Sequence, residues 1–570
     1  MNKDMDSVVY DMSKGKPDPQ IFIKKDWVNI LDNQNGAYNG NQSVIDTSQL
    51  SNSSKYMNYR EAYLNVPLVL SATAPYSAVV AEQFLPKTTA TSADYVFGLK
   101  NWYGSIIHSM TLDMNGTTII QQTPYSGLFN TFQLMTSLSV DDLATQGSAI
   151  GFFPDTAKSI GVSLANGING VASSTVNNNV VGAFDAVNLD TGFSSFNEGL
   201  LKRQQCWNFD PEGLSTGGSA YNSLITPQNL TNLWKSYVYN KQDNTAGPPT
   251  NLPGVFQVAI TAIIKLKHLH SFFNKIPLSK GLFLKLTLNL NQSSVSLTRA
   301  GGVFTAVSVN SPLGGVSPIM IANNGVATAL PDAITTVSIN VGKTVLNNTN
   351  ISQGAIPSPF GSNIILNVPA YTFTSIYESS YLESPIKTVD YYDIYQYQVL
   401  NIPTNGVFNN LISNGISGVK GVLVLPYYTA GSNGGIQPIQ SPFEGAGAGQ
   451  TSPLCLLTNF NVQLSGQNQI YNTQRYSHSQ FMDQLAGASG SCCASQVDGL
   501  TSSLVGLTDF EHSYNYYYVN CSYGEATEKD VPKSVNIIGT NSSAKAVDLF
   551  VFVIYDATVS FDVLTGSRVG

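Results

Sequence analysis

The sequence pattern with the most direct chemical meaning is Gly213-Leu214-Ser215-Thr216-Gly217, which matches the G-x-S-x-G turn of serine hydrolases. That turn needs a buried strand before it and a helix after it, because the serine must be held in a strained, accessible position. The flanking residues Asp210-Pro211-Glu212 and Gly218-Ser219 predict neither element. In a chain this rich in glycine and serine, a chance match is the better interpretation.

Two histidines could in principle bind a metal ion. His268 and His270 are two residues apart and would share one face of a strand, where they could supply two ligands. Lys265 and Lys267 lie beside them, and no carboxylate or cysteine partner is evident, so a solvated basic edge is favoured over a metal site. The histidines are too scattered to nominate a catalytic base; they are His108, His268, His270, His478 and His512.

Paired carboxylates would suit glycoside cleavage, and β-sandwich enzymes can draw their acids from distant parts of a sequence. The clearest close pairs are Asp141 with Asp142 and Asp390 with Asp393. A helix start explains the first pair and a strand edge explains the second. The glycine-rich run 445–449 lacks the last glycine and the preceding strand of a dinucleotide-binding loop, so it predicts a flexible loop.

The cysteines predict neither a disulfide framework nor a zinc module, because they are odd in number and irregularly spaced. Reduced thiols are the simplest interpretation, and a disulfide between the adjacent Cys492 and Cys493 would be strained. No D-x-D-x-D-G calcium loop is present. We therefore predict no catalytic residue, no cofactor and no metal. The cysteines are Cys206, Cys455, Cys492, Cys493 and Cys521.

The composition is unusual for a chain of 570 residues, because charged residues make up 11% where about 25% is typical. Polar uncharged residues and tyrosine replace them, which indicates a surface that is largely covered by other copies of the chain. The net charge is −8 and no dense basic run occurs, so we expect no direct binding to nucleic acid.

The first 20 residues contain charges where a signal peptide needs a continuous apolar core, so they predict a polar arm rather than an export signal. The longest purely apolar stretch, Leu549 to Tyr555, has seven residues, whereas a membrane-spanning helix needs about 20. We therefore expect no transmembrane segment.

Strand patterns dominate the sequence. Leucines at alternate positions from Leu282 to Leu290 predict a half-buried strand, and Val547 to Tyr555 is apolar on both faces, as expected of a strand covered from both sides. Helices are few: the clearest helical spacing is at Thr226–Val238, and a short helix is predicted from Ser139 to Gly147. Further strands are predicted at 63–70, 95–99, 256–266, 334–341, 364–373, 394–400, 421–427, 456–464 and 514–519.

An internal similarity indicates duplication. The segment that starts at Leu112 aligns without gaps with the segment that starts at Val462, with Gly116 on Gly466. Both read as an alternating strand, a glycine turn, a polar loop and an amphipathic helix. We therefore expect an all-β chain with a few short helices, divided into an N-terminal arm (1–54), a first β domain (55–300), a linker (301–344) and a second β domain (345–570). Long surface loops are expected at 165–188 and 430–452.

These segments resemble the double jelly-roll major capsid proteins of double-stranded DNA viruses, of the virophage and polinton-like virus type. The resemblance is carried by Asn115-Gly116 with its helix, Gly147 to Asp155, Phe273 to Gly281 with its leucine strand, and Leu464 to Asn468. It implies two tandem eight-stranded jelly rolls, a homotrimer of hexagonal outline and an icosahedral shell. The resemblance implies further copies, penton proteins and minor capsid proteins as partners, in a virion assembled inside the infected cell.

One alternative from another class stays open on the sequence. A carbohydrate-binding or glycoside-cleaving β-sandwich protein would share the strand pattern and the tyrosine content. Capsid subunits should assemble as salt-stable trimers, whereas the alternative predicts a monomer that binds or hydrolyses glycans. The arm is expected to lie beneath the shell or to reach a neighbour, because Trp27, Val28, Ile30 and Leu31 follow a polar start.

Overall fold

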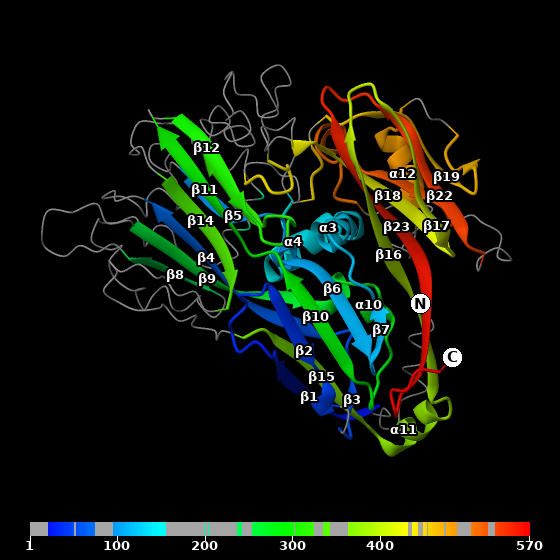
Figure 1. Ribbon diagram of the computed structural model, residues 1–570. Coiled ribbons are helices and arrows are strands. Elements are labelled where there is room, and N and C mark those ends of the chain that lie inside the picture. The colour runs from blue at the N-terminus through cyan, green and yellow to red at the C-terminus, as the bar shows by residue number, and fades with distance from the viewer. Residues whose placement is uncertain are drawn as a thin grey trace, which may run out of the picture.

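The computed structural model describes most of the chain in segments. Figure 1 shows two β-sandwiches side by side, the first at lower left and the second at upper right. The Gly213–Gly217 turn, Cys206, Cys492, Cys493 and the loop 165–188 lie outside the described residues. The described residues are 21–50, 53–74, 95–154, 199, 203, 236–241, 254–300, 303–323, 334–342, 363–430, 436–442, 449–452, 454–471, 475–486, 503–522 and 531–569.

The second sandwich is built from two antiparallel four-stranded sheets within the described part of the chain. Its strands are β16 (Ile386–Ile402), β17 (Val407–Ile416), β18 (Val419–Tyr428), β19 (Leu457–Leu464), β20 (Gln467–Asn468), β21 (Tyr517–Asn520), β22 (Lys533–Asn541) and β23 (Val547–Asp562). The sheet orders are β16-β23-β18-β21 and β17-β22-β19-β20. Numbered along the chain, these orders read 1-8-3-6 and 2-7-4-5, the arrangement of a jelly roll.

The first sandwich repeats this arrangement. Its equivalent strands are β1 (Phe22–Leu31), β2 (Gln42–Asp46), β4 (Tyr63–Ala74), β6 (Ile107–Met114), β7 (Thr117–Ile120), β9 (Gly254–Lys265), β10 (Leu284–Leu290) and β15 (Ile365–Phe373). One sheet contains β1-β15-β4-β9 and the other is β2-β10-β6-β7, again 1-8-3-6 and 2-7-4-5. The predicted all-β fold with two tandem eight-stranded jelly rolls is therefore confirmed.

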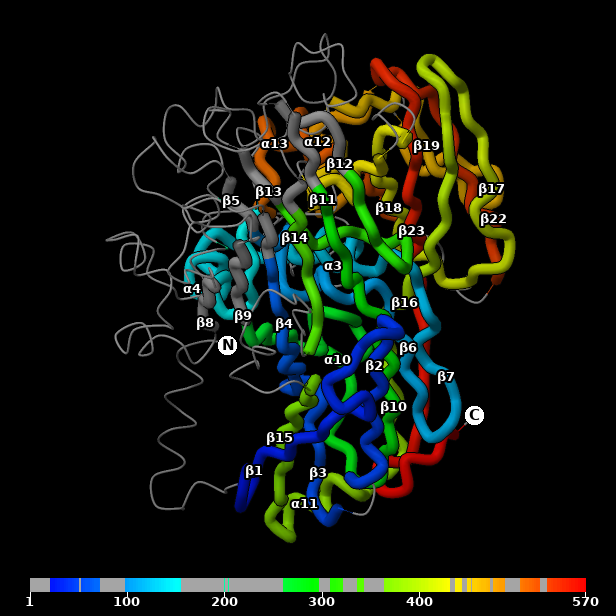
Figure 2. The backbone as a smooth tube through the Cα atoms, turned by 60° about the vertical axis from the view of Figure 1, so that its left-hand side comes forward, coloured from blue at the N-terminus to red at the C-terminus, as the bar shows by residue number. Residues whose placement is uncertain are grey.

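Extra strands widen the first jelly roll. They bring its larger sheet to nine strands among the described residues and add a two-stranded ribbon of β5 with β13. The extra strands are β3 (Tyr56–Met57), β5 (Tyr95–Leu99), β8 (Ser236–Lys241), β11 (Ser293–Ala300), β12 (Val303–Asn310), β13 (Ile319–Asn323) and β14 (Ile334–Val341). Figure 2 shows β11, β12 and β14 extending this sheet away from β4.

The expected domain boundaries need correction. β1 and β2 lie in the segment expected as an arm, 1–54, and β15 lies in the segment given to the second domain, 345–570, yet all three complete the first jelly roll. The expected linker, 301–344, holds β12, β13 and β14. The many polar residues of this segment suggested a linker, but on β14 they alternate with apolar residues. Val337 and Ile339 are buried and face the core. The first jelly roll thus runs from residue 22 to residue 373.

The internal similarity reflects equivalent parts of the two jelly rolls. Asn115-Gly116 connects β6 with β7, and Ser465-Gly466 connects β19 with β20. Both turns have positive φ at both residues, 47° and 82° in the first and 49° and 84° in the second, which a two-residue hairpin of this twist requires. Helices α3 (Ser126–Ser137) and α12 (His478–Ala486) follow the two hairpins.

The remaining helices are short. Helix α4 (Val140–Ile150) begins with the predicted acidic turn, and Ser139 and Asp142 form a reciprocal capping box. Most of the helix expected over Thr226–Val238 lies outside the described residues. Its last three residues, Ser236 to Val238, are not helical, because they pair with β9 as part of β8. No helix in the described segments is long and apolar enough to cross a membrane. The others are η1 (Ser48–Leu50), η2 (Tyr103–Ile106), η6 (Leu266–His268), α10 (Phe272–Lys275), α11 (Ser375–Leu382) and α13 (Leu507–His512).

The end of the chain fastens the second jelly roll to the first. Strands β16 and β23 are long enough to run down beside the first jelly roll (Figure 1). The Lys280 N–H, which follows α10, donates to the Val563 carbonyl at 2.8 Å. A Cβ atom at Gly281 would lie 1.8 Å from the Leu564 carbonyl oxygen, so this close approach of two backbones requires glycine.

Replacing Gly281 with alanine is expected to lower stability by about 1–3 kcal/mol, because the new methyl group must displace the backbone at Leu564. Thermal unfolding followed by circular dichroism would measure the change. Gly415→Ala is the matched control, since nothing lies within 4 Å of a Cβ atom at Gly415. Equal melting temperatures for the two variants would contradict the proposed close approach.

Candidate functional site

The two histidines that could have bound a metal do not lie on a strand. His268 ends η6, and His270 lies between η6 and α10, so the prediction of a shared strand face is wrong. The solvated basic edge is also wrong for these two side chains. His270 is buried, and burial together with the nearby charges of Lys267 and Lys265 lowers the pKa of His268 to about 3.

His270 has a carboxylate partner that lies 123 residues further along the chain. Its Nε2 atom is 3.3 Å from Oδ1 of Asp393 on β16, and both side chains are buried. The Phe272 N–H donates to Nδ1 of His270 at 3.2 Å, so the ring proton belongs on Nε2 and points at the carboxylate. Asp393 also accepts hydrogen bonds from the Tyr555 hydroxyl and from the Ile394 N–H.

This arrangement favours a structural role over a catalytic one. A general base needs a free lone pair that faces substrate, whereas the Nδ1 lone pair of His270 is occupied by a backbone N–H. The carboxylate of Asp393 is engaged by three donors. The group is a buried polar contact that ties the first jelly roll, through His270, to the second, through Asp393.

The other candidate carboxylates have local roles. Asp390 accepts from the Thr558 hydroxyl across β16 and β23, which agrees with the predicted strand-edge role. Asp142 caps α4, which agrees with the predicted helix start. Among the described residues no group of three or more His, Cys, Asp or Glu side chains could hold a metal ion.

The free edge of β16 is covered by the first jelly roll at the same place. The Ser271 hydroxyl donates to the Tyr392 carbonyl and accepts from the Tyr392 N–H. The Thr123 hydroxyl donates to the Ile394 carbonyl at 3.2 Å. An unpaired strand edge exposes backbone N–H and C=O groups that can pair with another chain. Here side-chain hydroxyl groups bond to these backbone groups, so no further strand is needed.

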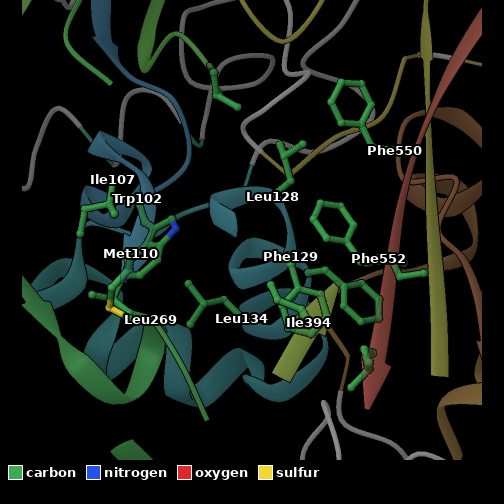
Figure 3. Close-up of a cluster of buried hydrophobic side chains, with 14 of the residues drawn as sticks. Trp102, Ile107, Met110, Leu128, Phe129, Leu134, Leu269, Ile394, Phe550 and Phe552 are labelled. Carbon is green, nitrogen blue, oxygen red and sulfur yellow. The ribbon is translucent and has the colours of Figure 1, made fainter. Parts of the chain in front are cut away.

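Above this polar contact, helix α3 lies on the outer face of the sheet β16-β23-β18-β21, the face turned away from the second jelly roll's own core. Phe129 contacts Phe552 with ring centroids 6.0 Å apart, and Phe132 stacks on Tyr518 at 5.7 Å. Tyr125, just before α3, meets Phe550 edge to face at 5.0 Å. Figure 3 shows Phe129 beside Phe552 and Ile394 in this cluster.

The covered sheet explains why β23 is apolar on both faces. Phe550 and Phe552 face α3, while the alternate residues Leu549, Val551 and Val553 face the core of the second jelly roll. The sequence left open whether a neighbouring domain or another subunit covers the second face, and the structure assigns it to the first jelly roll. We call this contact, formed by α3 and the His270–Asp393 pair against β16, β23 and β21, the interdomain seam.

The equivalent outer face of the first jelly roll is open in part. Leu31, Ile365, Asn65 and Ile263 lie opposite one another across β1, β15, β4 and β9 and therefore share one face. Leu31 is 56% exposed, and the other three are half-buried. Trp27, further along β1, is 49% exposed and contacts Tyr63 on β4. The sequence identified Trp27 and Leu31 as candidate contact residues but placed them on an arm rather than on a sheet.

Comparisons with known proteins identify similar folds. No protein-family model matches the chain, and no curated protein matches it. A chain in the cryo-EM structure of the Sputnik virophage is similar at a TM-score of 0.47 and 11% identity, over 97% of this chain and 89% of that chain. The mavirus major capsid protein gives a TM-score of 0.45 and 13% identity, over 98% and 92% of the two chains. The faustovirus major capsid protein gives 0.41 and 10%, over 95% and 91%. The strand orders 1-8-3-6 and 2-7-4-5 in both domains define the double jelly-roll fold independently of these likenesses.

Replacing Asp393 with alanine is expected to destabilise the protein by about 3 kcal/mol, because it removes the acceptor of the buried His270 and of the half-buried Tyr555 hydroxyl. Urea unfolding would measure the loss. Asp390→Ala, on the same strand but exposed, should change stability by less than about 0.5 kcal/mol. Similar losses in both variants would show that the buried pair is not a special contact.

Acid should destabilise the fold partly through His268. Its folded pKa of about 3 lies below the unfolded value of about 6.5, so the unfolded chain binds the extra proton between these values and stability falls as the pH decreases. At pH 4.5 the expected contribution is about 2 kcal/mol relative to pH 7. His268→Gln should therefore lose less stability than the wild type between pH 7 and pH 4.5 in urea unfolding, and an identical loss would contradict the assignment.

Proposed function

We propose that this chain is the major capsid protein of a double-stranded DNA virus. Three copies would form a capsomer of hexagonal outline, and many capsomers would tile an icosahedral shell in the virion. The observation that carries the proposal is the pair of jelly rolls joined by the interdomain seam, with an equivalent open face left on the first jelly roll. In such a unit the outer sheet face of the second jelly roll is covered within the chain. The equivalent sheet face of the first jelly roll would be available to another copy.

The composition supports the same proposal. A surface with little charge lets neighbours approach without desolvating many ion pairs, and many weak contacts can add up in a shell. The two jelly rolls share one continuous core of buried residues, so each copy would enter the assembly as a single rigid block. Penton and minor capsid proteins would be further partners, and assembly would take place inside the infected cell.

Size-exclusion chromatography with light scattering is expected to give a trimer that persists in about 1 M salt, since its contacts would be mainly apolar and uncharged. Negative-stain electron microscopy should show particles of hexagonal outline. The matched test for the alternative function is a glycan array with the same sample. A monomer at all concentrations, with glycan binding or hydrolysis, would contradict the capsid proposal.

A further inference from the structure

Three cationic side chains of the first jelly roll come together where β9 ends. Lys265 is the last residue of β9, which pairs with β4, and Lys267 belongs to η6, which follows directly. Arg60 lies in the loop 58–62, which leads into β4. The Leu266 N–H donates to the Ala62 carbonyl at 3.1 Å and so fastens η6 to this loop. We call Arg60, Lys265 and Lys267 the basic cluster.

The basic cluster is not neutralised by a carboxylate of the chain. Within the described segments, none of its side-chain nitrogen atoms takes part in an ion pair or a hydrogen bond. The neighbouring Glu61 feels the charge of Arg60, but its carboxylate is bonded to Lys25 at 2.7 Å and to the Tyr371 hydroxyl at 3.1 Å. Lys265 and Lys267 are half-buried, so water screens them less than it screens an extended surface lysine.

The three positive charges raise one another's energy. Burial lowers the pKa of Lys267, and the charges of Lys265 and Arg60 lower it further. Both lysines also help to lower the pKa of the buried imidazole of His268, whose Nδ1 atom has no hydrogen-bond partner. Like charges held close together cost energy that a bound anion would recover. In a chain of net charge −8 with few charged residues, such a group of cations is a local feature and not a property of the whole surface.

The chemistry of the basic cluster fits a compact anion that carries several charges. The guanidinium of Arg60 offers a planar pair of donors that matches two phosphate oxygens, and each lysine adds a point charge. A single carboxylate would leave two of the three positive charges uncompensated. Nucleic acid spreads its charges along a strand, whereas β4 and the rest of β9 contain no lysine or arginine to follow it.

We propose that Arg60, Lys265 and Lys267 form a binding site for a compact phosphate anion of two or more charges, of the kind that pyrophosphate represents. Arg60 would hold two of its oxygens, and the two lysines would neutralise the remaining charge. The bound anion would join the loop before β4 to η6 and so stabilise the first jelly roll close to the interdomain seam. The site lies within one chain, so this inference does not depend on the oligomeric state and can fail or hold separately from the proposed function.

Isothermal titration calorimetry of the full chain with pyrophosphate tests the site, and the wild type is expected to bind one anion per chain. The double variant Lys265→Gln, Lys267→Gln removes two charges and should raise the dissociation constant by about 100-fold, since two charge-assisted contacts are lost. Arg60→Gln changes an exposed side chain and should raise it by about tenfold. Lys285→Gln is the matched control, because Lys285 is exposed on β10 in the other sheet of the same jelly roll, and its affinity should equal that of the wild type.

Thermal unfolding separates loss of binding from loss of folding. Without ligand, the double variant should be at least as stable as the wild type, because two repelling charges are gone. Pyrophosphate should raise the melting temperature of the wild type and of Lys285→Gln, but not that of the double variant. Absence of saturable binding by the wild type, or equal affinities of the wild type and Arg60→Gln, would overturn the inference. An equal loss in Lys285→Gln would also overturn it by showing general attraction to the surface, as would binding of duplex DNA without binding of pyrophosphate.

Discussion

An apolar outer sheet face that cannot remain in water determines how this protein is built. In a β-sandwich each sheet buries one face in its own core, and the other face is ordinarily polar. Here Phe550 and Phe552 make the outer face of the second jelly roll apolar as well. Helix α3 of the first jelly roll covers that face, so the second jelly roll depends on its neighbour in the same chain.

The polar contacts of the interdomain seam give the covering a defined position. Aromatic contacts between α3 and β23 are strong but tolerate sliding, whereas the His270–Asp393 hydrogen bond and the Ser271 contacts to Tyr392 have fixed geometry. The glycine at 281 allows the end of the chain to reach the same side of the first jelly roll. Together these contacts hold the two jelly rolls in one orientation, which a subunit of a repeating shell requires.

Local patterns predicted much of the fold from the sequence. Alternating leucines located β10, the Asn115-Gly116 and Ser465-Gly466 turns located two equivalent hairpins, and Ser139 located the start of α4. These signals are short-range, so a single sequence contains them. The apolar residues on both faces of β23 also predicted a sheet that is covered on both sides. They could not show which part of the molecule covers the outer face.

Contacts between distant segments were not predictable in the same way. Nothing near β1 in sequence shows that it pairs with β15, more than 300 residues away, so the arm and the linker were placed wrongly. The contact of His270 with Asp393 was missed for the same reason, because the two residues are far apart in the sequence. The sequence predicted a solvated edge, whereas the structure shows a buried contact. Trp27 and Leu31 stood out in the sequence as apolar residues after a polar start, but only the fold shows which sheet they belong to and which residues lie beside them.

The central claim is that the interdomain seam fixes the two jelly rolls as one unit, which assembles with further copies of the chain. A cryo-EM reconstruction of the assembled protein at side-chain resolution tests it most directly. The account predicts three copies in a capsomer of hexagonal outline, with α3 of each copy covering β23 and β21 of its own chain. A reconstruction of isolated monomers, or one in which α3 lies away from β23 and β21 of its own chain, would contradict it.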